Sequence, residues 1–303
     1  MARPLDTITA ARELGAQSLR SSPRSRWLRF LLADKKATAG LVVLTIITFA
    51  AVFAPLVAPH DPTAMAFEFL EKPSLTHPLG TDDLNRDLFS RIVHGARISL
   101  FVGLSTVFIS LVIGVTLGLL AGYYGGLLDN IIMRYIDLLW AFPNFIIAVY
   151  LVAIFGTGLS NVIVAVSLAF IDDFARIARG MVLSLKEKEY VEGARSLGAS
   201  DARIILRHIL PNSLPPLIVQ ATVSISYAIL AEAGLSFLGL GVKSSTPTWG
   251  LILSDARSFI SRAWWLGVFP GLAIMLTVLS INFLGDWLRD VLDVREQAEE
   301  PQH

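Results

Sequence analysis

The chain has 303 residues, carries 25 basic and 25 acidic side chains and contains no cysteine. The zero formal net charge gives no indication of nucleic-acid binding, and the lack of cysteine excludes disulfides and thiolate metal sites. Apolar residues make up 54% of the chain and the mean hydropathy is +0.62, values typical of a protein that crosses a membrane several times. We therefore expect an all-α polytopic membrane protein.

The first 38 residues are polar and arginine-rich, and this stretch is too long for the charged region of a cleaved signal. We expect residues 1–38 to form a cytoplasmic tail ahead of a first membrane helix over residues 39–57. An external loop over residues 58–97 follows. Leu84, Leu88 and Ile92 recur at helical spacing, which predicts an amphipathic helical segment in this loop.

Further apolar runs within residues 98–288 predict the remaining membrane helices, about six in all with the first. These runs cover residues 98–122, 131–155, 160–177, 214–238 and 266–287. Trp264, Trp265 and Trp287 flank the last run, where interfacial anchors are expected. Residues 289–303 form a predicted C-terminal tail.

Lysine and arginine are concentrated in the N-terminal tail and in the segment after the run 160–177. With about six membrane helices these two segments share a side, and the positive-inside rule places both in the cytoplasm. Both chain termini are then cytoplasmic.

The polar stretch over residues 186–211 separates two apolar runs and predicts two short helices joined at Gly198. Ser200 or Asp201 can cap the second helix, which runs toward Pro211. The first helix carries apolar residues along one side, namely Tyr190, Val191, Ala194 and Leu197. A polar helix pair outside the bilayer predicts a surface that another protein grips.

Small residues recur every four positions at Gly114, Gly118 and Gly122. This spacing favours close helix packing within the chain, and a helix that slides against a partner is the alternative. The i, i+4 spacing of Asp172 and Arg176 favours a structural ion pair over a functional intramembrane charge.

Five other residues are candidates for the transport pathway or a gate, each with a structural alternative. Pro143 precedes Asn144, so this position is either a kink or part of a substrate path. A carboxyl held by neighbouring hydroxyls is the alternative for Glu232, and inter-helix hydrogen bonding is the alternative for Asn282. The five candidates are Asn144, Asp173, Glu232, Trp249 and Asn282.

Catalytic signatures are missing from the sequence. It contains no Gly-x-Ser-x-Gly elbow, no paired histidines at metal-ligand spacing and no G-x-x-x-x-G-K-[ST] phosphate loop. We expect a non-catalytic chain without a cofactor or metal of its own. If it moves a solute with ATP, the ATPase is another chain.

The polar stretch resembles a signature of permease subunits from bacterial and archaeal ABC importers. Glu192-Gly193-Ala194, then Gly198, then Leu210-Pro211 match the pattern E-A-A…G…L-P, with Gly193 in place of the first alanine. His208 stands where isoleucine is usual. The segments His77 to Asp82, Gly95 to Leu100 and Leu235 to Gly241 look like the C-type permease of the dipeptide, oligopeptide and nickel subgroup.

The resemblance implies a type I importer permease fold with a cytoplasmic coupling helix, in a bacterial or archaeal inner membrane. It implies a homologous B-type permease, two ATP-binding subunits that hold ATP and Mg²⁺, an extracytoplasmic solute-binding protein and membrane lipid as partners. The implied function is peptide import by alternating access, with nickel chelates, glutathione or oligosaccharides as alternative solutes. The implied coupling residues are Tyr190, Val191, Glu192, Gly193, Ala194, Leu197, Gly198, Leu210 and Pro211.

Two other classes of protein remain as alternatives. A stand-alone secondary carrier would use Asp172, Asp173 and Glu232 as ion sites, but the chain lacks the internal repeat typical of such carriers. An intramembrane hydrolase would need a nucleophile–base pair, which the sequence does not offer.

Overall fold

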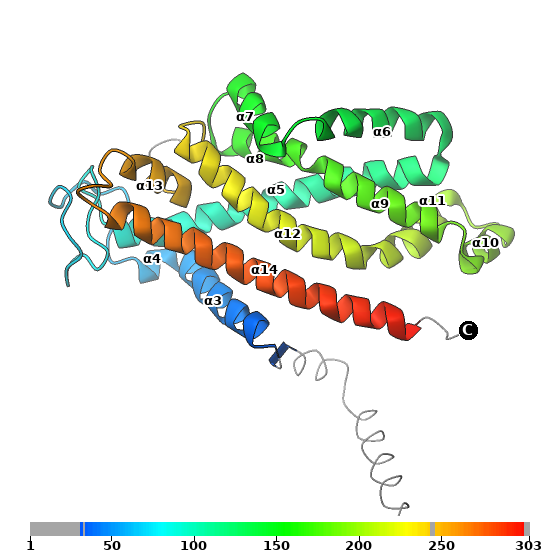
Figure 1. Cartoon of the computed structure of the whole chain (residues 1–303), viewed down its shortest axis with the longest axis horizontal. Coiled ribbons are helices and arrows are strands. Elements are labelled where there is room, and N and C mark those ends of the chain that lie inside the picture. The colour runs from blue at the N-terminus through cyan, green and yellow to red at the C-terminus, as the bar shows by residue number, and fades with distance from the viewer. Residues whose placement is uncertain (1–30, 33, 243–245, 300–303) are drawn as a thin grey trace, which may run out of the picture.

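A computed structural model describes residues 31–32, 34–242 and 246–299, and these residues form helices, loops and one isolated bridge between Thr81 and Asp87. The helices pack lengthwise into an elongated bundle (Figure 1). Their bounds are α3 Lys35–Val52, α4 Ala54–Val57, α5 Leu88–Tyr124, α6 Gly126–Trp140, α7 Asn144–Phe155, α8 Leu159–Ala169, α9 Ile171–Leu185, α10 Glu189–Ser196, α11 Asp201–Ile204, the π-helix η1 Ile205–Ile209, α12 Leu210–Phe237, α13 Trp249–Ala256 and α14 Trp265–Glu299.

The two ends of the bundle differ (Figure 1). Helices α10 and α11 project from one end, which we call the elbow end. At the opposite end, the loop over residues 58–87 lies beside α13, and we call this the loop end.

Four described helical segments are long and apolar enough to cross a membrane: residues 35–52, 88–124, 201–237 and 265–292. Helices α6 and α7 form a fifth candidate, bent by 92° where Pro143 interrupts the chain. The predicted run 160–177 instead divides at Phe170 between α8 and α9. The expected six spans therefore correspond to four continuous helices, one bent pair and one divided segment.

Helix α5 begins at Leu88, earlier than predicted, because Asp87 caps it and accepts a hydrogen bond from the Ser90 amide at 2.8 Å. Residues 59–87 contain no α-helix, so the predicted amphipathic helical segment does not include Leu84. Hydrogen bonds across the loop replace it, as where the Thr81 hydroxyl donates to the Glu68 carbonyl at 2.6 Å.

Glycines bring α5 close to α9, which confirms the predicted packing within the chain. A Cβ atom at Gly114 would lie 2.7 Å from the Phe174 Cβ, and one at Gly122 would lie 2.7 Å from the Val182 Cβ. Real carbon atoms do not approach so closely, so only glycine permits this helix separation.

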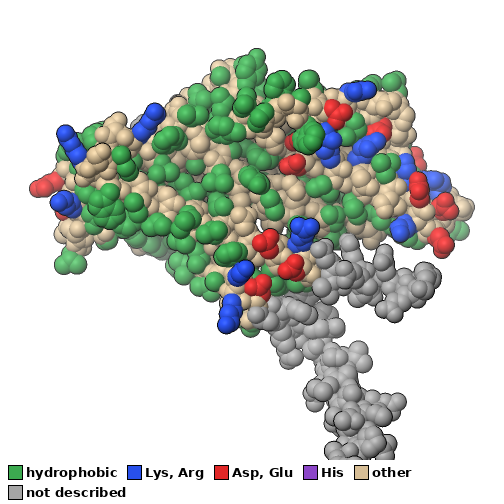
Figure 2. All heavy atoms as spheres, in the orientation of Figure 1, with side chains coloured by type: hydrophobic (Ala, Val, Ile, Leu, Met, Phe, Trp, Pro, Cys, Tyr) green, Lys and Arg blue, Asp and Glu red, His purple; other side chains and the backbone are tan. Residues whose placement is uncertain are grey.

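The surface between the two ends is largely apolar (Figure 2). Helix α3 exposes Ile46 and Phe49, and α6 exposes Leu127 and Leu138. Charged side chains gather mostly toward the elbow end, with a smaller group at the loop end (Figure 2). This distribution suits a bundle whose middle lies in lipid.

The two tryptophans at the start of α14, Trp264 and Trp265, differ in their surroundings. Trp264 is exposed, as an interfacial anchor should be, but Trp265 is buried and its Nε1 donates to the Thr81 carbonyl at 3.2 Å. Trp265 therefore anchors the loop end rather than lipid. Helix α14 continues to Glu299, so the described part of the predicted tail 289–303 is helical. The tail arginines up to Arg29 lie outside the described residues.

Candidate functional site: a helical elbow and a cavity

The predicted elbow forms between α10 and α11. Gly198 has a φ of +80°, a left-handed conformation that glycine adopts without strain. Its amide donates to the Arg195 carbonyl at 3.0 Å, and the Ala199 amide donates to the Ala194 carbonyl at 3.1 Å. This pair of bonds is a Schellman motif, which ends α10 and turns the chain.

The elbow is fastened to the bundle core. Val191 is fully buried, as is Ile204 of α11, and both belong to the main apolar core. The Tyr123 hydroxyl at the end of α5 donates to the Asp201 carboxylate at 2.7 Å, and the Lys186 ammonium donates to the Gly122 carbonyl at 3.2 Å. These contacts join the segments on both sides of α10 to the end of α5.

The four apolar residues predicted to lie along one side of the first elbow helix differ in their exposure. Val191 is turned inward and Ala194 is half-buried, whereas the Leu197 side chain is 91% exposed. Tyr190, Glu192 and Gly193 are also exposed, and partial burial raises the pKa of Tyr190. Tyr190, Glu192, Gly193 and Leu197 are therefore among the residues of this segment that a partner can contact.

Leu210 and Pro211 follow a π-helical turn. The Leu210 amide donates to the Ile205 carbonyl, five residues back, so the turn is wider than an α-helical one. A proline ring clashes with the carbonyl four residues earlier in a regular helix, and a wider turn relieves this clash. The second elbow helix consequently continues without a break from Asp201 to Phe237, where the sequence had suggested a separate short helix.

Two of the predicted pathway residues line one cavity. Asn144 at the start of α7 and Asp173 on α9 border a space of about 370 Å³, together with Phe145, Phe170, Tyr227, Leu230 and Ala231. Asp173 also accepts a hydrogen bond from the Gln220 amide at 3.3 Å. The cavity thus combines a carboxylate with aromatic and aliphatic walls.

Glu232 and Trp249 lie elsewhere, in a buried cluster where α12 meets α5 and α13. The Ser236 hydroxyl donates to Glu232 at 2.8 Å and the Ser99 hydroxyl donates at 3.4 Å. The Trp249 indole donates to the Ile92 carbonyl at 3.0 Å. The structural alternative for Glu232, a carboxyl held by hydroxyls, matches this geometry. Asn282 lies on α14 and does not line the cavity.

The predicted ion pair between Asp172 and Arg176 does not form. Arg176 instead donates to Asp137 of α6 at 2.7 Å and stacks over Trp140 at 4.7 Å from its ring centre. The Asp172 carboxylate is buried and has no hydrogen-bond partner among the described residues. Arg179 likewise contacts Asp129 of α6, at 2.6 Å. Both arginines therefore point toward α6, which carries their acidic partners.

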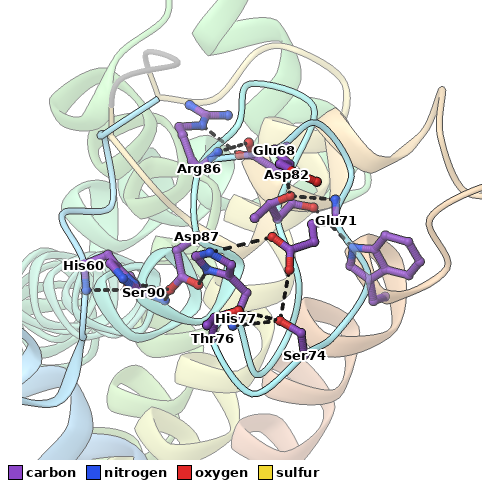
Figure 3. A network of polar contacts seen from close by, with 12 residues as sticks. His60, Glu68, Glu71, Ser74, Thr76, His77, Asp82, Arg86, Asp87 and Ser90 are labelled. Carbon is purple, nitrogen blue, oxygen red and sulfur yellow. Dashed lines mark hydrogen bonds and ion pairs between the residues drawn. The ribbon is translucent and has the colours of Figure 1, made fainter. Parts of the chain in front are cut away.

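The loop end holds a buried ion network (Figure 3). The Asp82 carboxylate accepts from Arg86 at 2.7 Å and from Arg91, and both arginines also contact Asp255 in the last turn of α13. Burial, and then the negative charges of Asp82 and Asp255, raise the pKa of the neighbouring Asp83. The network ties the start of α5 to α13.

Asp87 forms a second polar group at the loop end. Burial favours a higher pKa for Asp87, but hydrogen bonds from Ser90 and His77 outweigh burial and lower it. No pattern in the sequence identified the contact between His77 and Asp87, because loop residues separate the two side chains.

Comparisons with known proteins agree with this architecture. Residues 114–297 match the family described as the binding-protein-dependent transport system inner membrane component. The chain belongs to this family of ABC importer permeases. Residues 22–75 match the N-terminal TM domain of oligopeptide transport permease C, which identifies the C-type subgroup.

Curated relatives cover most of the chain. It is 45% identical to a di/tripeptide transport system permease of Pseudomonas aeruginosa over 90% of this chain and 92% of the relative. It is 48% identical to a glutathione transport system permease of Pectobacterium atrosepticum over 91% and 92%. An inward-facing structure of the MetNI methionine ABC transporter shares the fold, with a TM-score of 0.57 at 20% identity over 68% of this chain and 97% of that chain.

Proposed function

We propose that this chain is one of two membrane subunits of an ATP-driven importer of di- or oligopeptides, and that it works by alternating access. The names of the relatives support peptides as the solute class. The single observation that carries the mechanism is the elbow, which is exposed at Leu197 and fastened to the core at Val191. Force applied to α10 therefore reaches α5 and α12.

In this proposal the chain hydrolyses no ATP. Two ATP-binding subunits contact the exposed face of α10 and α11, so the elbow end and both termini are cytoplasmic. A homologous permease completes the pathway, and a solute-binding protein docks at the loop end outside the cytoplasmic membrane. The basic residues near the elbow support this orientation.

The cavity beside Asp173 offers groups that can contact a peptide. A carboxylate at the wall can accept the ammonium group of a peptide N-terminus, while Phe145 and Tyr227 contact side chains. Glutathione has the same ammonium and amide groups, so it is the alternative solute, consistent with the name of the Pectobacterium relative.

The test is uptake of a radiolabelled dipeptide by proteoliposomes containing the complex purified through this chain. We expect Leu197→Ala and Glu192→Ala to lower uptake per ATP hydrolysed. Leu56→Ala removes a similarly exposed leucine on α4, near the loop end, and should leave this ratio unchanged. ATP-independent uptake by this chain alone would instead support a secondary carrier.

A glutathione competition experiment separates the two solutes. Excess unlabelled dipeptide should abolish uptake of the labelled dipeptide, and glutathione should do so only if the importer carries it. Failure of every peptide to compete, in a complex that still hydrolyses ATP, would contradict the proposed solute class.

A further inference from the structure

Two histidines and an aspartate converge at the loop end from three separate places in the sequence. His60 follows α4, His77 lies midway along the loop, and Asp87 caps α5. Figure 3 shows both imidazole rings beside the Asp87 carboxylate. The His77 Nδ1 lies 2.9 Å from the Asp87 Oδ1, and the His60 Nδ1 lies 3.8 Å from the Asp87 Oδ2.

We propose that His60, His77 and Asp87 bind a first-row divalent metal ion such as Zn²⁺. Two imidazole nitrogens and one carboxylate oxygen form a donor set that suits zinc, with a fourth position for water. One ligand atom from each residue lies within 4.8 Å of the others. Metal–ligand bonds of about 2.0–2.2 Å place neighbouring ligands of a tetrahedral ion roughly 3.4 Å apart. The separations of His77 Nδ1 from Asp87 Oδ1, 2.9 Å, and of His60 Nδ1 from Asp87 Oδ2, 3.8 Å, lie on either side of that value.

His60 supplies an independent indication of a ligand. Its Nδ1 is buried but has no hydrogen-bond partner among the described residues, which is unfavourable for a polar atom. The 3.8 Å separation from Asp87 is too long for a hydrogen bond. A metal ion between the two groups would contact both. The side chain as a whole is 32% exposed, so an ion can approach from the external side.

The surrounding residues hold two of the ligands in place. The Asp87 Oδ2 accepts from the Ser90 hydroxyl at 2.6 Å and from the Ser90 amide at 2.8 Å. The other nitrogen of His77 lies 3.8 Å from the Glu71 carboxylate, which accepts from the Ser74 hydroxyl at 3.0 Å. At this separation Glu71 makes no hydrogen bond to His77, and its negative charge increases the basicity of the imidazole as a ligand.

A bound ion would join three segments: the chain after α4, the loop and the first residue before α5. Metal binding to the folded chain would stabilise this end of the protein. The proposal does not depend on the transported solute or on the ATP-binding partners, so it can fail while the proposed transport function stands.

The experiment titrates Zn²⁺ into the metal-free, detergent-purified chain carrying a tag without histidine, and measures stoichiometry by calorimetry. We expect about one Zn²⁺ per chain and a higher unfolding temperature. His60→Phe retains a ring against Phe67, which lies 4.7 Å from the His60 ring centre, but removes the ligand atom. It should abolish both effects. Glu71→Gln removes the charge beside His77 and should weaken binding severalfold.

His94→Gln is the matched control, because His94 is a half-buried histidine near this group whose ring contacts the Ser90 carbonyl at 3.0 Å. It should bind Zn²⁺ as the wild type does. Unfolding temperatures in EDTA verify that each variant is folded. No stoichiometric binding by the wild type, or unchanged binding by a folded His60→Phe variant, would overturn the proposal.

Discussion

The contact between α5 and α9 predicts a large effect for one added methyl group. In Gly118→Ala, the new Cβ would lie 2.7 Å from the Ala178 Cβ and 3.0 Å from the Arg179 amide nitrogen, and closest to the Ala175 carbonyl oxygen. Carbon atoms in ordinary contact are about 3.5–4.0 Å apart, so the two helices must separate by roughly 1 Å. Two of these three contacts are with backbone atoms, which cannot rotate away.

Overpacking of this kind costs about 1–3 kcal/mol, and 2 kcal/mol lowers the ratio of folded to unfolded protein about thirtyfold. Gly180→Ala on α9 is the matched control, because a Cβ there would meet no atom within 4 Å. Both changes gain about the same helix propensity, so the difference between the variants isolates the steric clash.

The assay is thermal unfolding of the detergent-purified chain, followed by loss of helical circular dichroism. We expect Gly118→Ala to unfold several degrees below Gly180→Ala, which should be as stable as the wild type or more stable. Gly122→Ala should lose less than Gly118→Ala, since its shortest contact, 2.7 Å to the Val182 Cβ, is longer than the contact of Gly118 with the Ala175 carbonyl oxygen. Equal midpoints for Gly118→Ala and Gly180→Ala would refute the steric argument.

Three further predictions concern buried polar groups. Asp82→Asn removes one of the two carboxylates that Arg86 and Arg91 share and leaves them only Asp255, so it should destabilise the chain by about 3 kcal/mol in chemical unfolding. The exposed Asp61→Asn is the control, and equal loss in both variants would exclude the network as the cause. Glu232→Gln keeps an acceptor for the Ser236 hydroxyl and should have nearly the unfolding free energy of the wild type, whereas Glu232→Ala should lose roughly 1–3 kcal/mol of it. A severe transport defect in a stable Glu232→Gln variant would instead indicate a role for the charge. The raised pKa of Asp83 means that its ionisation opposes folding, so the stability of the chain falls as pH rises from about 4 through the folded-state pKa. Asp83→Asn should therefore raise the free energy of unfolding by less than about 1 kcal/mol at pH 7 and leave it unchanged below pH 4. An equal gain at both pH values would contradict this reasoning.

Local patterns were sufficient for the elements whose cause is local. Long apolar runs predicted the membrane helices because a chain in lipid must satisfy its backbone hydrogen bonds within each helix. Gly198 predicted the elbow because a left-handed residue after a helix favours glycine. The glycines on α5 predicted close packing, although the sequence did not show that α9 is the partner helix.

Other features depended on contacts between distant segments. Val191 and Leu197 both read as apolar residues of one helix, and only the packing of α10 on the core separates the buried one from the exposed one. Arg176 pairs with Asp137 rather than with Asp172, because α6 lies against α9 and offers a closer carboxylate. Helical spacing alone could not decide between these partners.

The amino-acid sequence by itself determined the membrane class, the elbow and the family resemblance, since each depends on hydropathy, glycine conformation or a short motif. The tertiary structure alone decided which polar residues meet. It separated Glu232 from the cavity that Asn144 and Asp173 share, and it gathered His60, His77 and Asp87 at one point. The physical reason is that loop paths and helix rotations, which set these meetings, depend on the packing of the whole bundle.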